Sequence, residues 1–182
     1  MPLKIVQYPD PILKKKSVPV QKVDKDTQKL IEDIFETMYA APGVGLAAVQ
    51  VGVLQRVLVI DVGRLEDGKR RPDPLAIINP VIVEREGKIE WEEGCLSLPE
   101  MVIPMERSKK IVVAGLDATG QPIKIAGEDL MSVAFQHEID HLDGLLLVDR
   151  LSRLKRELYR KQLEKQGPEE PVEKGVGPVY LG

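Results

Sequence analysis

The chain has 182 residues, of which 43% are apolar and only 4% aromatic, so aliphatic side chains must fill its core. That length fits one compact domain, and a net charge of −3 argues against a general nucleic-acid-binding protein. The lone cysteine excludes an internal disulfide, no segment approaches the length of a membrane span, and the N-terminus lacks the apolar run of a signal peptide. We therefore expect a cytoplasmic protein.

The first part of the chain predicts one helix after an irregular start. Residues 3–22 are rich in proline, and Pro9-Asp10-Pro11 predicts a turn. From Lys25 to Ala41, apolar residues recur at intervals of three and four, which is typical of an amphipathic helix, and Pro42-Gly43 would end it.

Strands are predicted to dominate the middle of the chain. Their predicted positions are residues 56–61, 75–78, 81–86, 88–92, 110–116 and 122–125. The last two are joined by a turn sequence and should form a hairpin. Residues 63–74 are charged and contain proline and glycine, so we expect an exposed loop there.

The last third of the chain predicts a helix at residues 128–142, ended by Gly144, then a short strand at 145–148 and a helix at 151–166. Strands clustered between helices indicate an α+β fold. We expect antiparallel strands packed around the helix at 128–142, with an N-terminal and a C-terminal helix. Residues 1–166 should form a single catalytic domain, and the composition of the Pro- and Gly-containing tail at 167–182 favours disorder.

Both histidines of the chain lie in the segment Gln136-His137-Glu138-Ile139-Asp140-His141. A spacing of four on a helix stacks the two imidazoles on one face, which is typical of a metal site. Glu138 lies one residue round the helix and could reach a water molecule at the same metal. The alternative is a pair of ordinary solvated or core histidines, which the glutamate at this spacing disfavours.

Cys95, in Glu92-Glu93-Gly94-Cys95-Leu96-Ser97, is the predicted third ligand. A lone cysteine is normally a small buried hydrophobe, but Gly94 permits close backbone approach, and the acidic and serine neighbours do not suit a core filler. One thiolate and two imidazoles leave a fourth position for water, as in catalytic sites. A closed structural zinc site would need a further cysteine or histidine, which the chain lacks.

The segment from Gly43 to Gln50 contains two glycines followed by small residues. Such a segment suits a backbone that runs close to a ligand, and Gln50 offers an amide donor of the kind that stabilises an oxyanion. A glycine-rich turn before a buried strand explains the same pattern equally well, so both interpretations stay open on this evidence.

Together and in this order, the segments Gly43–Gln50, Glu93–Ser97 and Gln136–His141 resemble the three motifs of peptide deformylases of the bacterial type with a C-terminal helix. The resemblance extends from about residue 3 to about residue 160. It implies a metal-dependent hydrolase that removes the formyl group from the N-terminal formylmethionine of new polypeptides and releases formate. Formylmethionyl nascent peptides would be its substrates.

The resemblance also assigns roles to the predicted ligands. Cys95, His137 and His141 would bind one divalent ion, natively Fe²⁺, with Zn²⁺, Ni²⁺ or Co²⁺ able to occupy the same mixed thiolate and imidazole site. Glu138 would carry a proton from the attacking water to the leaving amine.

Substrate-binding roles follow by the same resemblance. The Gln50 amide and the backbone N–H of Leu96 would stabilise the oxyanion, and Gly45 would contact the peptide backbone. The implied methionine pocket has four apolar residues: Val44, Leu130, Val133 and Ala134. Helical periodicity alone favours packing of the last three in the core. Between Pro99 and Arg107 the sequence departs from the family spacing, and a substrate-binding arginine of some members is not clearly matched.

Three other functions compete with this interpretation. His-Glu-x-x-His is shared with zinc endopeptidases, although Cys95 and the short chain favour a small, tight site. A nucleophilic Cys95 with a histidine base would leave the second histidine and Glu138 without a role. A catalytically silent binding protein of the same fold would have no need of the complete set of ligands.

The C-terminal helix predicts a basic surface. The segment from Arg150 to Lys165 has seven basic residues: Arg150, Arg153, Lys155, Arg156, Arg160, Lys161 and Lys165. Leu151, Leu154 and Leu158 predict a stripe that docks the helix on the domain. The basic face is either an ordinary solvated surface or, as the resemblance implies, a site that associates with ribosomes.

Overall fold

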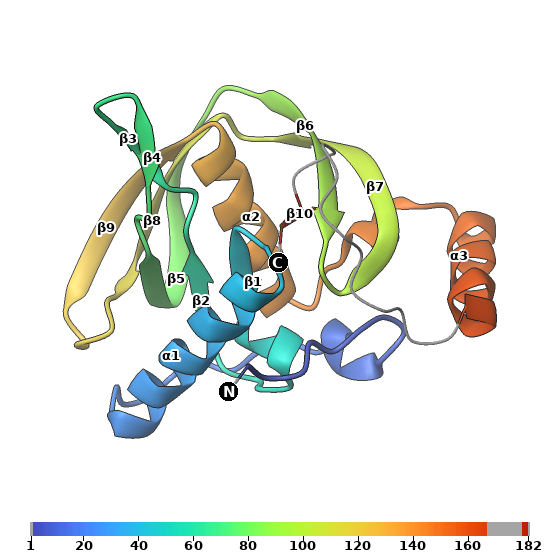
Figure 1. Cartoon of the computed structure of the whole chain (residues 1–182), viewed down its shortest axis with the longest axis horizontal. Coiled ribbons are helices and arrows are strands. Elements are labelled where there is room, and N and C mark those ends of the chain that lie inside the picture. The colour runs from blue at the N-terminus through green and yellow to red at the C-terminus, as the bar shows by residue number, and fades with distance from the viewer. Residues whose placement is uncertain (1, 167–179, 182) are drawn as a thin grey trace.

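The computed structural model describes residues 2–166, 180 and 181 (Figure 1). The helical segments are η1 (Pro11–Lys14), α1 (Lys25–Ala40), η2 (Ala48–Val51), α2 (Leu130–Leu142), η3 (Leu147–Arg150) and α3 (Arg153–Gln166), where η marks 3₁₀ geometry. The strands are β1 (Gly45–Ala47), β2 (Val57–Ile60), β3 (Arg64–Glu66), β4 (Lys69–Arg71), β5 (Leu75–Glu86), β6 (Ile89–Cys95), β7 (Leu98–Arg107), β8 (Lys110–Leu116), β9 (Pro122–Glu128) and β10 (Tyr180–Leu181).

Two sheets lie on either side of α2, as Figure 1 shows. The larger sheet has the order β1-β2-β5-β8-β9 and is antiparallel throughout. The smaller sheet has the order β10-β6-β7, and β3 and β4 form a separate hairpin. The predicted α+β class with antiparallel strands is confirmed, and so is the hairpin at residues 110–125.

The first helix forms where its apolar spacing predicts. The Asp24 side chain caps α1 by accepting a hydrogen bond from the Thr27 N–H at 3.0 Å. Ile31, Ile34 and Met38 are buried on one face, and the helix packs on β1 and β2. This packing holds the loop that leads from α1 into Gly45 against the larger sheet.

Helix α2 is buried on nearly every side. Ten of its 13 residues are buried, including the polar side chains of Ser132, Gln136 and Glu138. The helix ends at Leu142, and Gly144 follows the C-cap with a φ of 74° that suits glycine. A Cβ on Gly144 would lie 2.5 Å from the Lys14 carbonyl oxygen. The N-terminal segment is thereby packed against the end of the helix that carries both histidines.

Several predicted elements were wrong in detail. Residues 63–74 are exposed but contain the β3–β4 hairpin rather than a plain loop. The two strands predicted at 75–78 and 81–86 are one strand, β5, with an irregularity at Asn79-Pro80, where the sequence had suggested a break. No strand forms at 145–148: residues 145–146 are irregular, and residues 147–148 are the first half of η3.

Strands β1 and β7 were not predicted. Strand β7 contains Pro99 and Pro104, which interrupt its alternating pattern and normally confine a strand to a sheet edge. It is indeed an edge strand, paired only with β6 among the described residues. Strand β1 has only three residues, all small or apolar and all buried, so it has no alternation to detect.

The C-terminal helix α3 is arranged differently from the prediction. Leu154 is 70% exposed and Leu158 57% exposed, so these two leucines do not dock the helix. Tyr159 makes the contact instead: its ring stacks on Tyr8 with centroids 5.9 Å apart, and its hydroxyl donates to the Pro99 carbonyl at 2.6 Å.

Most of the tail predicted to be disordered, residues 167–179 and 182, lies outside the described residues. Its two described residues, Tyr180 and Leu181, are ordered as strand β10, and Leu181 is completely buried. These two residues differ from the disorder that the composition of the tail favours. No helix in the described part of the chain is long and apolar enough to cross a membrane.

Candidate metal centre

Three buried side chains converge between β6 and α2. His137 and His141 lie one turn apart on α2, and Cys95 is the last residue of β6. The two Nε2 atoms lie 3.1 Å apart, and Nε2 of His141 lies 3.4 Å from Sγ of Cys95. All three potential ligand atoms fall within 4.8 Å of one another, so the structure brings the predicted ligands together.

The donor set fits a divalent transition metal. Thiolate and imidazole together suit Zn²⁺ and several neighbouring ions. Nδ1 of His137 lies 3.0 Å from Oε1 of Glu93, which leaves its Nε2 directed toward the other two donors. Among the described residues the cluster offers three ligands, so a fourth coordination position would remain for water or substrate.

A buried ion-pair network supports His137 from behind. Arg107 binds Glu93 with two hydrogen bonds of 2.8 Å and donates to Asp140 at 2.6 Å. Burial alone would raise the pKa of Glu93, but the hydrogen bonds from Arg107 and His137 outweigh it and hold that pKa below its ordinary value. Glu93 therefore stays anionic and keeps the imidazole of His137 in one orientation.

Gln50 is held beside Cys95 by its own hydrogen bonds. Its Oε1 accepts from the Ala47 N–H at 3.0 Å, and its Nε2 donates to the Ser97 hydroxyl at 3.0 Å. The same Nε2 lies 3.9 Å from the Cys95 sulfur. The amide is fully buried, so it is fixed close to the ligand cluster with its N–H₂ group directed toward β6.

Glu138 lies against the backbone of Gly45. The Glu138 side chain is completely buried, and a Cβ on Gly45 would lie 2.8 Å from its Oε1. Only glycine permits this approach without displacing the carboxylate. Strand β1 and α2 thus bring two predicted site residues, separated by 93 positions in the printed sequence, into direct contact.

The backbone N–H of Leu96 is already engaged in this structure. It donates to the Leu181 carbonyl oxygen at 3.0 Å. The four residues of the predicted methionine pocket (Val44, Leu130, Val133 and Ala134) lie in one apolar cluster, and Leu181 belongs to the same cluster.

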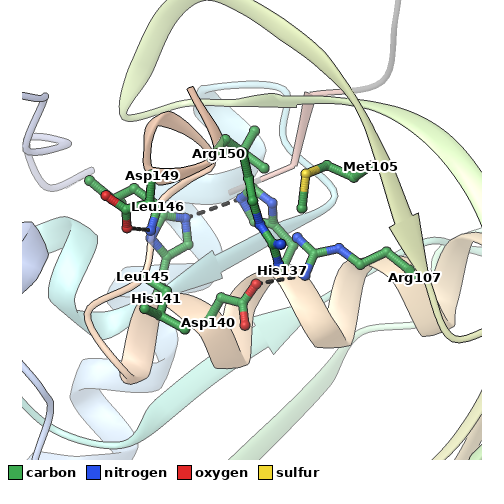
Figure 2. A pocket seen from close by; sticks show the side chains of 10 residues that line it. Met105, Arg107, His137, Asp140, His141, Leu145, Leu146, Asp149 and Arg150 are labelled. Atoms are coloured by element: carbon green, nitrogen blue, oxygen red, sulfur yellow. Dashed lines mark hydrogen bonds and ion pairs between the residues drawn. The ribbon is translucent and has the colours of Figure 1, made fainter. Parts of the chain in front are cut away.

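A separate pocket of about 270 Å³ is lined in part by His137 and His141. Figure 2 shows Arg107 and Asp140 facing one another beside His137 along its wall. The remaining lining residues are Met105, Leu145, Leu146, Leu147, Asp149 and Arg150. None of the predicted methionine-pocket residues lines this pocket, so the two regions are distinct.

Sequence reasoning missed the supporting roles of Glu93, Arg107 and Asp140. Glu93 was noted as the first residue of a family motif and as a poor neighbour for a core cysteine, and Arg107 only as the end of a stretch that departs from the family spacing. The two are 14 residues apart and meet because β6 and β7 pair across a turn. Asp140 lies between the two histidines, and the acidic residue inside the motif was the available signal.

Comparisons with known proteins agree with this arrangement. A sequence model described as polypeptide deformylase matches residues 2–157. A peptide deformylase of Thermodesulfovibrio yellowstonii is 48% identical over 162 residues, covering 89% of this chain and 96% of that protein. One of Nitrosococcus oceani is 50% identical over 164 residues, covering 90% of this chain and 95% of that protein.

Solved structures show the same fold. A peptide deformylase from Legionella pneumophila superposes with a TM-score of 0.81 at 45% identity, covering 91% of this chain and 95% of that one. A peptide deformylase from Ehrlichia chaffeensis, in complex with actinonin, superposes with a TM-score of 0.84 at 41% identity, covering 91% of this chain and 97% of that one.

Proposed function

The chain belongs to the peptide deformylase family, and we propose that Cys95, His137 and His141 hold the metal ion at which it works. It is a hydrolase that removes the N-formyl group from newly made polypeptides. The observation that carries the site assignment is the convergence of three buried donors beside the Glu138 carboxylate. A divalent ion bound there would act as a Lewis acid on the formyl group and make water a better nucleophile.

Iron is the proposed native ion, with Zn²⁺, Ni²⁺ or Co²⁺ as substitutes. The mixed sulfur and nitrogen donors support a transition metal but accommodate several. Metal analysis of protein purified without added metal, under anaerobic conditions, tests the choice. Equal half-lives of activity with and without oxygen would contradict iron, because oxidation of the ion or of Cys95 should inactivate an iron enzyme.

Glu138 is the proposed proton carrier. Its carboxylate would take a proton as the water oxygen adds to the formyl carbon, and would return it to the nitrogen as the C–N bond breaks. The products are formate and a free N-terminal amine. Contact with Gly45 supports this role, because it fixes the carboxylate where the peptide backbone is proposed to pass.

The Gln50 amide and the Leu96 N–H are the proposed oxyanion donors. The fixed position of Gln50 close to Cys95 supports its share, since a preorganised donor needs no reorientation during the reaction. Replacing Gln50 with Ala should lower kcat by about 10²–10³, with less effect on KM. An unchanged kcat would remove Gln50 from the mechanism.

Substrate binding is proposed to use Gly45 and the apolar cluster of Val44, Leu130, Val133 and Ala134. Their common cluster beside the ligands of α2 supports a pocket for the methionine side chain. Residues 1–166 are the proposed catalytic domain.

The most decisive test measures metal content and formate release together, with a formyl-Met peptide as substrate. We expect stoichiometric metal, formate release, and loss of activity on chelation. Replacing Cys95 with Ser should abolish metal retention after dialysis while the fold persists, because a serine hydroxyl stays protonated at neutral pH. Cleavage of casein without formate release would instead indicate an endopeptidase.

The basic face of α3 is proposed to associate with ribosomes, which would place the enzyme in the cytoplasm where formylated chains emerge. Six basic residues lie within α3 against two glutamates, and most of these basic side chains are exposed. Replacing Arg153 and Arg160 with Glu should weaken co-sedimentation with ribosomes at low salt, because phosphate contacts supply such binding. The matched control replaces Lys69 and Arg71, in the exposed β3–β4 hairpin, with Glu. Equal co-sedimentation of both variants would contradict the proposal.

A further inference from the structure

The C-terminal strand β10 adds to the exposed edge of β6 immediately beside the ligand cluster. Tyr180 and Leu181 run parallel to β6, paired with Gly94 and Cys95. The strand also contacts α2, the helix that carries both histidines (Figure 1). Residues 180–181 therefore lie in extended conformation between the two elements that build the metal centre.

The Leu181 carbonyl takes a donor that the proposed reaction needs. Its oxygen accepts the Leu96 N–H at 3.0 Å, and the Leu96 N–H is one of the two proposed oxyanion donors. A peptide substrate cannot use this N–H while Leu181 is bound to it. The backbone of β10 and the backbone of a substrate thus compete for the same hydrogen bond.

The Leu181 side chain competes for the apolar space as well. It is fully buried and belongs to the cluster that includes Val44, Leu130, Val133 and Ala134, the proposed methionine pocket. Leucine and methionine have similar volumes and exchange in apolar sites at small cost. A buried leucine at this position therefore resembles the side chain that the pocket is proposed to receive.

We propose that residues Tyr180–Leu181 are an internal competitor of the substrate, bound by strand addition in the peptide groove with Leu181 in the side-chain pocket. The groove then takes an extended backbone and one unbranched or γ-branched aliphatic side chain, from this chain or from a formylated peptide. This inference rests on the proposed assignment of Leu96 and of the pocket.

A tethered competitor raises the apparent KM without touching the chemical step. The apparent affinity for substrate equals the intrinsic affinity multiplied by the fraction of molecules in which the groove is free. Because residues 167–179 tether β10 to α3, its effective concentration is high and does not change with dilution of the enzyme. A groove that is occupied most of the time should raise KM by about three- to tenfold.

Full-length chains with Leu181→Asp and Leu181→Met provide the test. The aspartate cannot enter an apolar pocket without a large desolvation cost, whereas methionine should retain the contact. Leu181→Asp should lower KM for a formyl-Met peptide by about three- to tenfold at unchanged kcat, and Leu181→Met should stay near the parent. Hydrogen exchange at the Leu96 amide should accelerate in Leu181→Asp alone, because that N–H loses its acceptor.

Two other outcomes overturn the proposal, and a third would refute the proposed reaction instead. Equal KM values with a lower melting temperature for Leu181→Asp would mean that β10 is only a structural strand. A KM difference that disappears on dilution would mean that the tail binds a second copy of the chain. Absence of formate release from all three chains, with the Leu96 exchange difference intact, would refute the proposed reaction and leave the occupied groove standing.

Discussion

Helices α2 and α3 are of nearly equal length, 13 and 14 residues, but they are stabilised in opposite ways. Helix α2 contains weak helix formers such as Ser132, Val133 and Phe135, and almost all of it is buried. Helix α3 consists mainly of Lys, Arg, Glu, Gln and Leu, which are strong helix formers, and it is largely exposed. Packing holds the first helix, whereas intrinsic propensity holds the second.

This contrast decides where chemistry can be placed. A helix fixed by surrounding strands holds side chains within the tolerance that a metal site and a proton carrier require. An exposed helix anchored mainly through Tyr159 cannot supply that rigidity, but it can present charge to a large partner. The proposed catalytic role thus belongs to α2, which is held by packing, and the proposed docking role belongs to α3, which is held by intrinsic propensity.

The largest expected difference concerns turnover. Glu138→Ala in α2 should reduce formate release by about 10²–10⁴ with the metal retained, because it removes the proton carrier and no ligand. Glu157→Ala in α3, an exposed glutamate that pairs only with Arg160 at 3.6 Å among the described contacts, is the matched control. If Glu138→Ala kept near-parent turnover, Glu138 would not be the proton carrier, and α2 would not supply that part of the reaction.

Substitutions in the two helices should also differ in how much they lower the free energy of unfolding. Phe135→Ala removes a fully buried ring from α2 and should lower the free energy of unfolding by about 3–5 kcal/mol. Denaturant unfolding of the metal-loaded protein measures the change. A loss of less than about 1 kcal/mol would mean that the surroundings of α2 collapse onto the cavity, so that the helix is less rigidly held than its burial indicates.

The smallest effect is expected on the other helix. Leu158→Ala in α3 should change the free energy of unfolding by no more than about 0.5 kcal/mol, since the side chain is 57% exposed and alanine is an excellent helix former. The same unfolding experiment compares it directly with Phe135→Ala. Equal losses for the two variants would invalidate the contrast between the helices.

The two helices also show what the sequence could predict. The histidine spacing in α2 and the cysteine motif predicted three ligands that the structure brings together, because both signals are local and chemically distinctive. The prediction that Leu154 and Leu158 dock α3 on the domain was wrong, because an apolar stripe does not identify the surface against which it packs. Arg107 reaches Glu93 only through the pairing of β6 with β7, which depends on long-range register that no local pattern encodes.

The occupied groove was beyond prediction for a related reason. The composition of the tail favours disorder, and only its pairing with the edge of β6 gives Tyr180 and Leu181 an ordered conformation. Such pairing depends on the partner edge rather than on the segment itself.

The buried ion-pair network has a consequence for charge balance. Glu93, Glu138 and the Cys95 thiolate would place three negative charges in the interior, against the single guanidinium of Arg107. Asp140, the other partner of Arg107, is 32% exposed, so water screens its charge. Uncompensated buried charge is costly, so an ion carrying two positive charges would bring the interior to neutrality. Burial alone would lower the pKa of His137, but its hydrogen bonds with Cys95 and Glu93 raise that pKa well above its ordinary value. Without the ion, protonated His137 should therefore supply part of the missing positive charge, and loading the ion should release its proton. Calorimetric titrations in buffers of different ionisation enthalpy would count the released protons, and a count of zero would mean that His137 is already neutral before the metal arrives.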